Sequence, residues 1–123
     1  MDQIYIENII KRVKEYISYE LKFNVKKVKA NELNTYCNYI SYEGGIVLIY
    51  WHYAIEKITE SLTRLAHELG HVELKHFLIK PDKDYRKRYK YEKAAWKRAI
   101  RLAKIFKWQF NKSIMKKYLN EYK

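Results

Sequence analysis

The chain has 123 residues, 48% of them hydrophobic, which predicts one globular domain over residues 1–123. No apolar run approaches the roughly 18 residues of a membrane span. The N-terminus lacks the basic start and apolar block of a secretory signal. The single cysteine, Cys37, excludes an intramolecular disulfide, and its apolar-aromatic neighbours place it in the core rather than as a nucleophile. These features together predict a cytoplasmic protein.

The formal net charge of +12 is concentrated in the C-terminal part of the chain. Residues 75–123 hold 17 of the 26 basic and 4 of the 14 acidic residues, which gives +13 there and −1 elsewhere. A basic region of this kind suits nucleic acid or an acidic partner. A solvated helix face is the preferred explanation, because no DNA-reading motif accompanies the charge.

The first half of the chain predicts a helix followed by three strands. Apolar residues recur every three or four positions from Asp2 to Leu21, which indicates an amphipathic helix. Residues 23–28 alternate weakly, and residues 35–42 are rich in tyrosine, threonine and isoleucine. After the Gly44-Gly45 turn signal comes the apolar run Ile46–Tyr50, so the last two strands are expected to form a hairpin.

The second half predicts helices. The first covers about residues 55–77, the next covers 85–106 with Asp82 or Asp84 as a possible cap, and a short one covers 111–122. The predicted fold class is therefore α+β: an N-terminal helix, a small, mostly antiparallel three-stranded sheet, a long helix, and one or two C-terminal helices. No internal repeat or linker divides the chain.

Within the first of these C-terminal helices, His67-Glu68-Leu69-Gly70-His71 is the stretch whose spacing specifies a reaction. Two histidines four residues apart lie on one face of a helix, where both imidazoles can bind one ion. Zinc held by three protein ligands lowers the pKa of a bound water to about 7, and a neighbouring carboxylate, here Glu68, acts as general base. Gly70 inside a helix costs about 1 kcal/mol relative to alanine, which indicates a close contact there.

A catalytic zinc needs a third protein ligand, and Glu92 is the best candidate. Glu92 shares one helical stripe with Ala95, Ala99 and the apolar residues that follow, so it is a lone acid on the buried face of a basic helix. Binding a cation resolves the cost of burying such a carboxylate. The alternative is a boundary glutamate paired with Lys93 or Arg88.

Other candidates for the third ligand fit less well. His76 lies five residues after His71, which turns it away from the ligand face of a continuous helix. Asp82 and Asp84 follow the helix end too closely to fold back onto it easily. The metal set predicted from the residues is therefore His67, His71 and Glu92.

These residues resemble the ImmA/IrrE-type zinc metallopeptidases. The resemblance lies in His67-Glu68-Leu69-Gly70-His71-Val72-Glu73-Leu74-Lys75-His76 and in Tyr91-Glu92-Lys93-Ala94-Ala95-Trp96-Lys97-Arg98-Ala99, and it extends over about residues 20–106. It implies zinc on His67, His71 and Glu92, with Glu68 as the base. Ala94 and Trp96 depart from the acidic and Asp or Asn positions that the family often has after this ligand. The resemblance further implies cleavage of a helix-turn-helix repressor of a mobile element or stress regulon.

The sequence thus predicts a zinc-dependent endopeptidase of a specific protein partner. A substrate strand is expected to pair with an exposed sheet edge at Ile46–Tyr50. By residue type alone, the oxyanion could be stabilised by one of four residues: Tyr50, His52, His76 or Tyr89. A peptidase toxin with a single host target is a further reading. The alternative from another class is a non-catalytic basic module that binds nucleic acid or an acidic protein, with structural zinc or none.

Overall fold

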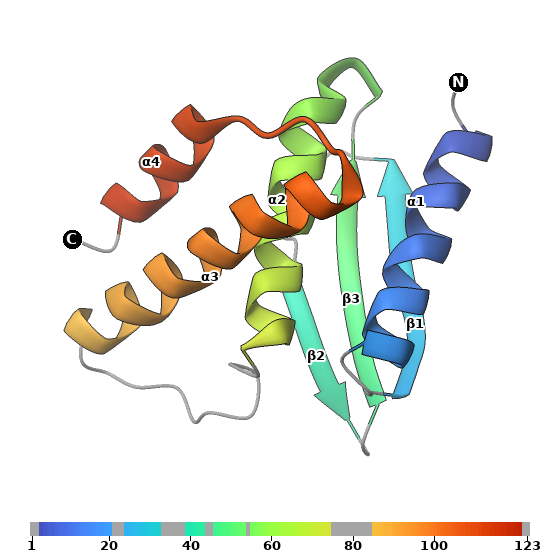
Figure 1. Cartoon of the computed structure of the whole chain (residues 1–123), viewed down its shortest axis with the longest axis horizontal. Coiled ribbons are helices and arrows are strands. Elements are labelled where there is room, and N and C mark those ends of the chain that lie inside the picture. The colour runs from blue at the N-terminus through green and yellow to red at the C-terminus, as the bar shows by residue number, and fades with distance from the viewer. Residues whose placement is uncertain are drawn as a thin grey trace.

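The structure, a computed structural model, describes residues 3–20, 24–32, 39–43, 46–53, 55–74 and 85–121. In chain order its elements are α1 (Gln3–Glu15), a π-helical turn η1 (Tyr16–Glu20), β1 (Asn24–Glu32), β2 (Tyr39–Glu43), β3 (Ile46–Tyr53), a 3-10 turn η2 (Ile55–Lys57), α2 (Ile58–Glu73), α3 (Tyr85–Phe106) and α4 (Lys112–Asn120). They form three layers: the strands, then α1 and α2 on one face of them, then α3 with α4 outside α2 (Figure 1). The predicted helix 85–106 agrees with α3 at both ends.

The strands pair in the order β1-β3-β2, so β3 is central. It pairs with β1 in parallel and with β2 antiparallel; Ile49, for example, lies opposite Val28 on one side and Ile40 on the other. The antiparallel pairing of β2 with β3 agrees with the expected hairpin, whose Gly44-Gly45 turn lies outside the described residues. Strand β3 also continues through Tyr53, beyond its predicted end at Tyr50.

The predicted fold class, α+β on a small, mostly antiparallel three-stranded sheet, is wrong. Of the residues whose side chains the structure describes, 87% are helical and belong to four helices. Only Trp51 and Tyr53, at the end of β3, bring strand side chains into this described core. The pairing is also mixed, because β1 lies parallel to its neighbour. A continuous apolar run such as Ile46–Tyr50 is typical of a strand covered on both faces of a sheet with parallel pairing. Strand β3 lies between β1 and β2, whereas the edge position assigned to it requires a free side.

A first hydrophobic cluster joins α1 and α2 to the end of the sheet. Ile6, Ile9, Val13 and Ile17 recur at helical spacing on α1 and η1 and are buried. They belong to one cluster with Trp51 of β3 and with apolar residues of α2, among them Leu65, Leu69 and Val72. The Trp51 indole donates a hydrogen bond to the Ser61 carbonyl at 2.8 Å, which fixes β3 against the start of α2.

A second cluster connects α2, α3 and α4. Ala66, Trp96, Ala99 and Ala103 form its buried part, with Tyr118 and Leu119 of α4 packed against it. Helix α3 ends in a Schellman motif: the Trp108 amide donates to the Ala103 carbonyl at 2.8 Å, and Lys107 adopts a left-handed φ of 61°. The Asn111 side chain then caps α4 by accepting from the Ser113 amide at 2.9 Å.

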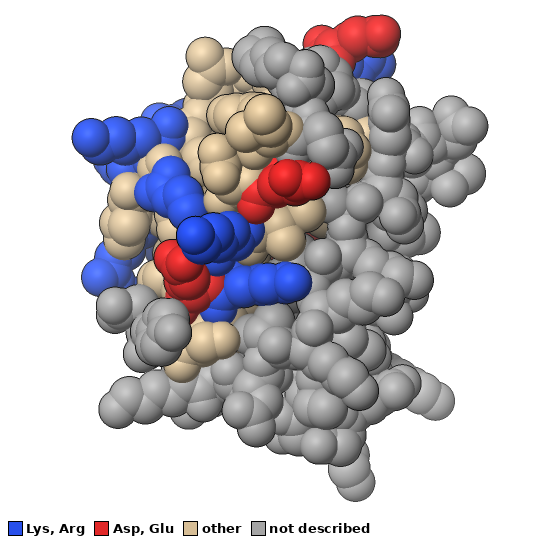
Figure 2. Space-filling view, turned by 90° about the vertical axis from the view of Figure 1, so that its right-hand side faces the viewer, with Lys and Arg blue, Asp and Glu red and all other residues tan. Residues whose placement is uncertain are grey.

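The outer surface of α1 carries charges of both signs. Glu7, Lys11, Lys14 and Glu15 surround a shallow hollow on this helix. Figure 2, which looks onto the α1 side of the molecule, shows acidic side chains among the lysines and arginines. Within the described residues, no helix has the combination of length and apolar composition that crossing a bilayer requires.

Candidate metal centre

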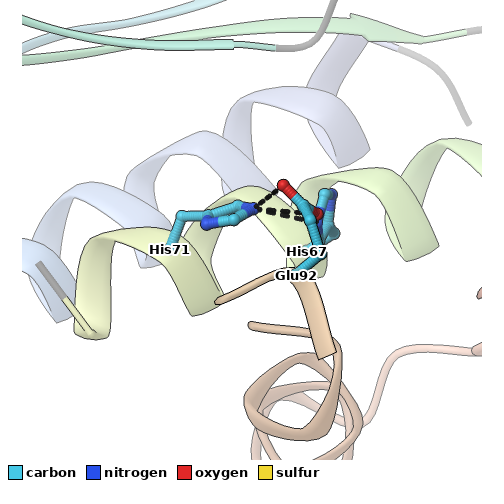
Figure 3. A group of neighbouring side chains, drawn as sticks. All are labelled: His67, His71 and Glu92. Carbon is cyan, nitrogen blue, oxygen red and sulfur yellow. Dashed lines mark hydrogen bonds and ion pairs between the residues drawn. The ribbon is translucent and has the colours of Figure 1, made fainter. Parts of the chain in front are cut away.

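The two motif histidines and Glu92 meet between α2 and α3 (Figure 3). Helix α2 presents His67 and His71 from successive turns, and α3 brings Glu92 up to them from the facing side. His67 Nε2 lies 2.8 Å from Glu92 Oε2 and 3.0 Å from His71 Nε2. His71 Nε2 lies 3.2 Å from Glu92 Oε1. Side chains 21 to 25 residues apart in the sequence therefore direct their donor atoms at one point.

A glycine makes this close approach of the two helices possible. A Cβ atom on Gly70 would lie 2.3 Å from the Ala95 carbonyl oxygen, so no larger residue fits there without moving α3. Gly70 precedes His71, and Ala95 lies one turn after Glu92, so this contact is adjacent to the donor atoms. The close contact that the sequence predicts at Gly70 is confirmed. Arg98 and Glu73 form an ion pair of 3.0 Å that links the same two helices farther along.

The electrostatics of the three groups suit a cation. Burial by itself raises the pKa of Glu92, but the hydrogen bonds from His67 and His71 outweigh it and lower that pKa to about 2. Burial lowers the pKa of His67, although its hydrogen bond to Glu92 acts in the opposite direction. At neutral pH the cluster thus combines an ionised carboxylate with a neutral His67 imidazole, and neutral imidazole is the form that binds metals.

The geometry of these donors also fits zinc. Two imidazoles and one carboxylate are a donor set that catalytic zinc sites use, with bonds of about 2.0–2.2 Å and tetrahedral angles, so neighbouring donors lie roughly 3.3 Å apart. The distances of 2.8–3.3 Å in this cluster approach that value. The side chains remain 15–16% exposed, so water or a substrate atom can reach the cluster. Among the described residues, His67, His71 and Glu92 form the group of His, Cys, Asp or Glu side chains whose ligand atoms lie within 4.8 Å of one another.

Glu68 lies beside the cluster rather than within it. It is a buried acid, 8% exposed, and its Oε1 lies 3.6 Å from His67 Nδ1, the ring nitrogen that does not face Glu92. Burial raises the pKa of Glu68 well above its usual value, and the negative charge of Glu92 raises it further. Glu68 is therefore a carboxyl group that holds its proton more tightly than an exposed glutamate does.

Trp96 contacts the cluster, and this contact was not predicted from the sequence. Its indole stacks on the His67 imidazole, with centroids 4.1 Å apart and planes 7° from parallel. Trp96 also packs against Phe110 and stacks with Tyr118 of α4, with ring centroids 6.3 Å apart. Trp96 follows Glu92 by four residues, and this spacing, which places both on one helix face, was the available signal.

The other residues that the sequence suggested lie on α3, on β3 or outside the described residues. Tyr89 is half-buried on α3, one turn before Glu92. Tyr50 and His52 belong to β3, whose backbone alone is described at these positions. Four residues lie outside the described residues: Cys37, His76, Asp82 and Asp84. Of the predicted set, the structure thus brings together His67, His71 and Glu92, with Glu68 adjacent.

No known protein family, curated protein or solved structure matches the chain. The class of site is therefore defined by its own residues: an HExxH helix and a glutamate from the next helix, converging on one point.

Proposed function

We propose that the protein is a zinc-dependent endopeptidase of the HExxH type that acts in the cytoplasm on a specific protein partner. The observation that carries the proposal is the convergence of His67, His71 and Glu92 within 2.8–3.3 Å, with the buried acid Glu68 at the first of these histidines. The contact of Gly70 with Ala95 holds the two helices together beside these donors. This supports a cation site, because partly buried donors must be held close together against their own desolvation.

In this proposal, His67, His71 and Glu92 hold the zinc ion, which polarises the scissile carbonyl and acidifies water when bound. Glu68 takes a proton from the attacking water and delivers it to the leaving amine. Its raised pKa suits this exchange, because a carboxyl that retains a proton near neutral pH can act as base and then as acid. With a cation held by His67, His71 and Glu92, the pKa of Glu68 would be lower and its carboxylate form would be favoured.

The substrate strand requires a sheet edge, and the predicted edge at Ile46–Tyr50 is not free. Strand β3 is paired on both sides, with β1 and with β2. The outer strand on the α2 side is β2, since α2 contacts β3 and β2 whereas α1 contacts β1. We therefore place the substrate along β2 (Tyr39–Glu43), where added backbone hydrogen bonds extend the sheet toward the cluster.

The nature of the substrate follows only from the resemblance of the motifs. A helix-turn-helix repressor of a mobile element or stress regulon is the protein to try first. Any helix-turn-helix protein encoded beside this chain's gene would be the natural probe.

Metal content tests the cluster itself. We expect the purified protein to bind about one zinc, and Glu92→Gln to weaken zinc binding by at least about 100-fold, since even outer-shell partners of metal ligands are worth 10–100-fold. Glu73→Gln is the matched control, because Glu73 is an equally buried acid that pairs with Arg98 in the same helix interface. Chelator competition with elemental analysis measures both variants. Equal zinc affinity in Glu92→Gln and the wild type would remove Glu92 from the site.

Cleavage tests the role of Glu68. Incubation with a helix-turn-helix protein encoded beside this chain's gene and with a synthetic peptide library, followed by mass spectrometry, is expected to reveal cut sites with the wild-type protein. Glu68→Gln should retain zinc and lose at least about 100-fold in rate, the lower part of the range for general acid–base catalysis. Undiminished cleavage by a zinc-loaded Glu68→Gln protein contradicts the proposed base, and zinc bound without cleavage of either probe favours a binding module.

A further inference from the structure

The outward face of α3 carries a line of cations. Their positions advance by three or four residues, so they lie along one side of the helix, and each of them is exposed. The line consists of Lys90, Lys93, Lys97, Arg101 and Lys104. At 100° per residue they occupy an arc of about 80°, and at 1.5 Å per residue they extend over about 21 Å.

This cationic stripe faces away from the candidate metal centre. Glu92, Trp96, Ala99 and Ala103 lie on the opposite side of α3, packed against α2 and α4 or joined to the histidines. The residues of the stripe are exposed, and α3 lies with α4 in the outer layer of helices (Figure 1). A partner bound to the stripe leaves the cluster accessible.

Within the part of the chain that the structure describes, the stripe has no counter-charge. No residue of the stripe forms an ion pair with a described residue, whereas Arg98, on another side of α3, is paired with Glu73. The sequence between Glu92 and Glu121 contains no acidic residue. On α1, by contrast, Glu7 and Glu15 accompany the lysines. Like charges three or four residues apart destabilise a helix, a cost that a bound polyanion removes.

We propose that the cationic stripe of α3 binds the phosphate backbone of double-stranded DNA. Along about 21 Å of its axis, B-form DNA carries about twelve phosphates on its two strands, which is more than enough to face the five cations of the stripe. An acidic protein fits less well, because stable protein interfaces have an apolar centre. On α3, Ile105 is the one large hydrophobic residue exposed among the described residues. Single-stranded nucleic acid is bound through exposed aromatic rings, and none is exposed on the described part of this face.

Fluorescence anisotropy with a labelled 20-base-pair DNA of arbitrary sequence tests the proposal. Five phosphate contacts predict that log K falls with log salt at a slope of about −4.5. The variant Lys93→Gln/Lys97→Gln/Arg101→Gln should bind at least about tenfold more weakly, and its slope should fall to about −2. Replacing Lys11, Lys14 and Lys57 by Gln removes the same charge elsewhere and should leave the slope unchanged.

Equal losses in the two triple variants, or no binding of the duplex at 50 mM salt, would overturn the proposal. So would polyglutamate or single-stranded DNA of equal charge that competes as well as the duplex. Glu92→Gln should bind DNA like the wild type, because Glu92 lies on the opposite face. The outcome is therefore independent of whether the protein proves to be a peptidase.

Discussion

The two faces of α3 use the same helix for opposite purposes. The inner face carries small residues, one tryptophan and a single acid, held within hydrogen-bonding distance of two histidines. The outer face carries exposed cations with no counter-charge among the described residues. Burial explains the difference: a charge on the inner face must be paired or bind a cation, whereas a charge on the outer face stays solvated. The inner face is therefore where a substitution should cost stability.

The largest expected effect is at Trp96. Trp96→Ala removes a fully buried indole and the surface on which the His67 ring rests, and we expect it to cost about 3–5 kcal/mol. Trp96→Phe keeps an aromatic surface and should cost less than half as much. Urea denaturation measures both variants, with Lys97→Ala on the outer face as a control that should change stability by less than about 0.5 kcal/mol. Similar losses at Trp96 and Lys97 would abolish the contrast between the faces.

A smaller effect is expected at Gly70. Alanine favours a helix over glycine by about 1 kcal/mol, so Gly70→Ala would stabilise α2 if nothing opposed it. Its Cβ would instead lie 2.3 Å from the Ala95 carbonyl oxygen, a backbone atom that moves only with α3. We expect a net loss of about 2 kcal/mol, within the range for overpacked cores, and weaker zinc binding because the helices separate. Unchanged or increased stability would show that α2 and α3 do not approach this closely.

The smallest effect is a pH-dependent gain at Glu68. The folded-state pKa of Glu68 is raised, so ionisation at high pH opposes folding, and stability from this group grows as the pH falls toward 4.5. Glu68→Gln should therefore stabilise the zinc-free protein at pH 8, by on the order of 1 kcal/mol, and lose this advantage near pH 4.5.

The pH dependence expected from Glu92 has the opposite sign. Its pKa of about 2 contributes stability that is present above pH 4.5 and is lost as the pH falls toward 2. Thermal melts in EDTA across this range check both signs; a destabilised Glu68→Gln protein at pH 8 would contradict the first.

The sequence allowed the site to be assembled because periodicity places side chains on helix faces. His67 and His71 are one turn apart, and Glu92 is the lone acid on the apolar stripe of α3, so both faces could be identified before their contact was known. The bounds of α3 were predicted for the same reason. In the sequence, Trp96 stands out only as a departure from a family pattern, because a stack of two rings depends on how two helices are rotated against each other.

The sheet was harder to predict because pairing direction is not a local property. The apolar run Ile46–Tyr50 identifies a strand, but only the return of the chain through β1 makes that strand central and its pairing with β1 parallel. Most of the described residues are helical. Their arrangement depends on long-range packing around α2, which contributes to both hydrophobic clusters, and no single segment of the sequence shows it. In the sequence, the cations of α3 are visible only as an excess of positive charge. That they lie on the outward side of the helix is known only once the opposite side is seen to be buried.

The stack of Trp96 on His67 gives the protein a built-in optical reporter. An indole in face-to-face contact with an imidazole responds in its emission when that ring gains a proton or a bound ion. Trp51 and Trp108 contribute a background that phenylalanine substitutions can remove. Occupancy of the cluster can then be followed by titration in real time, without a substrate and without any attached dye.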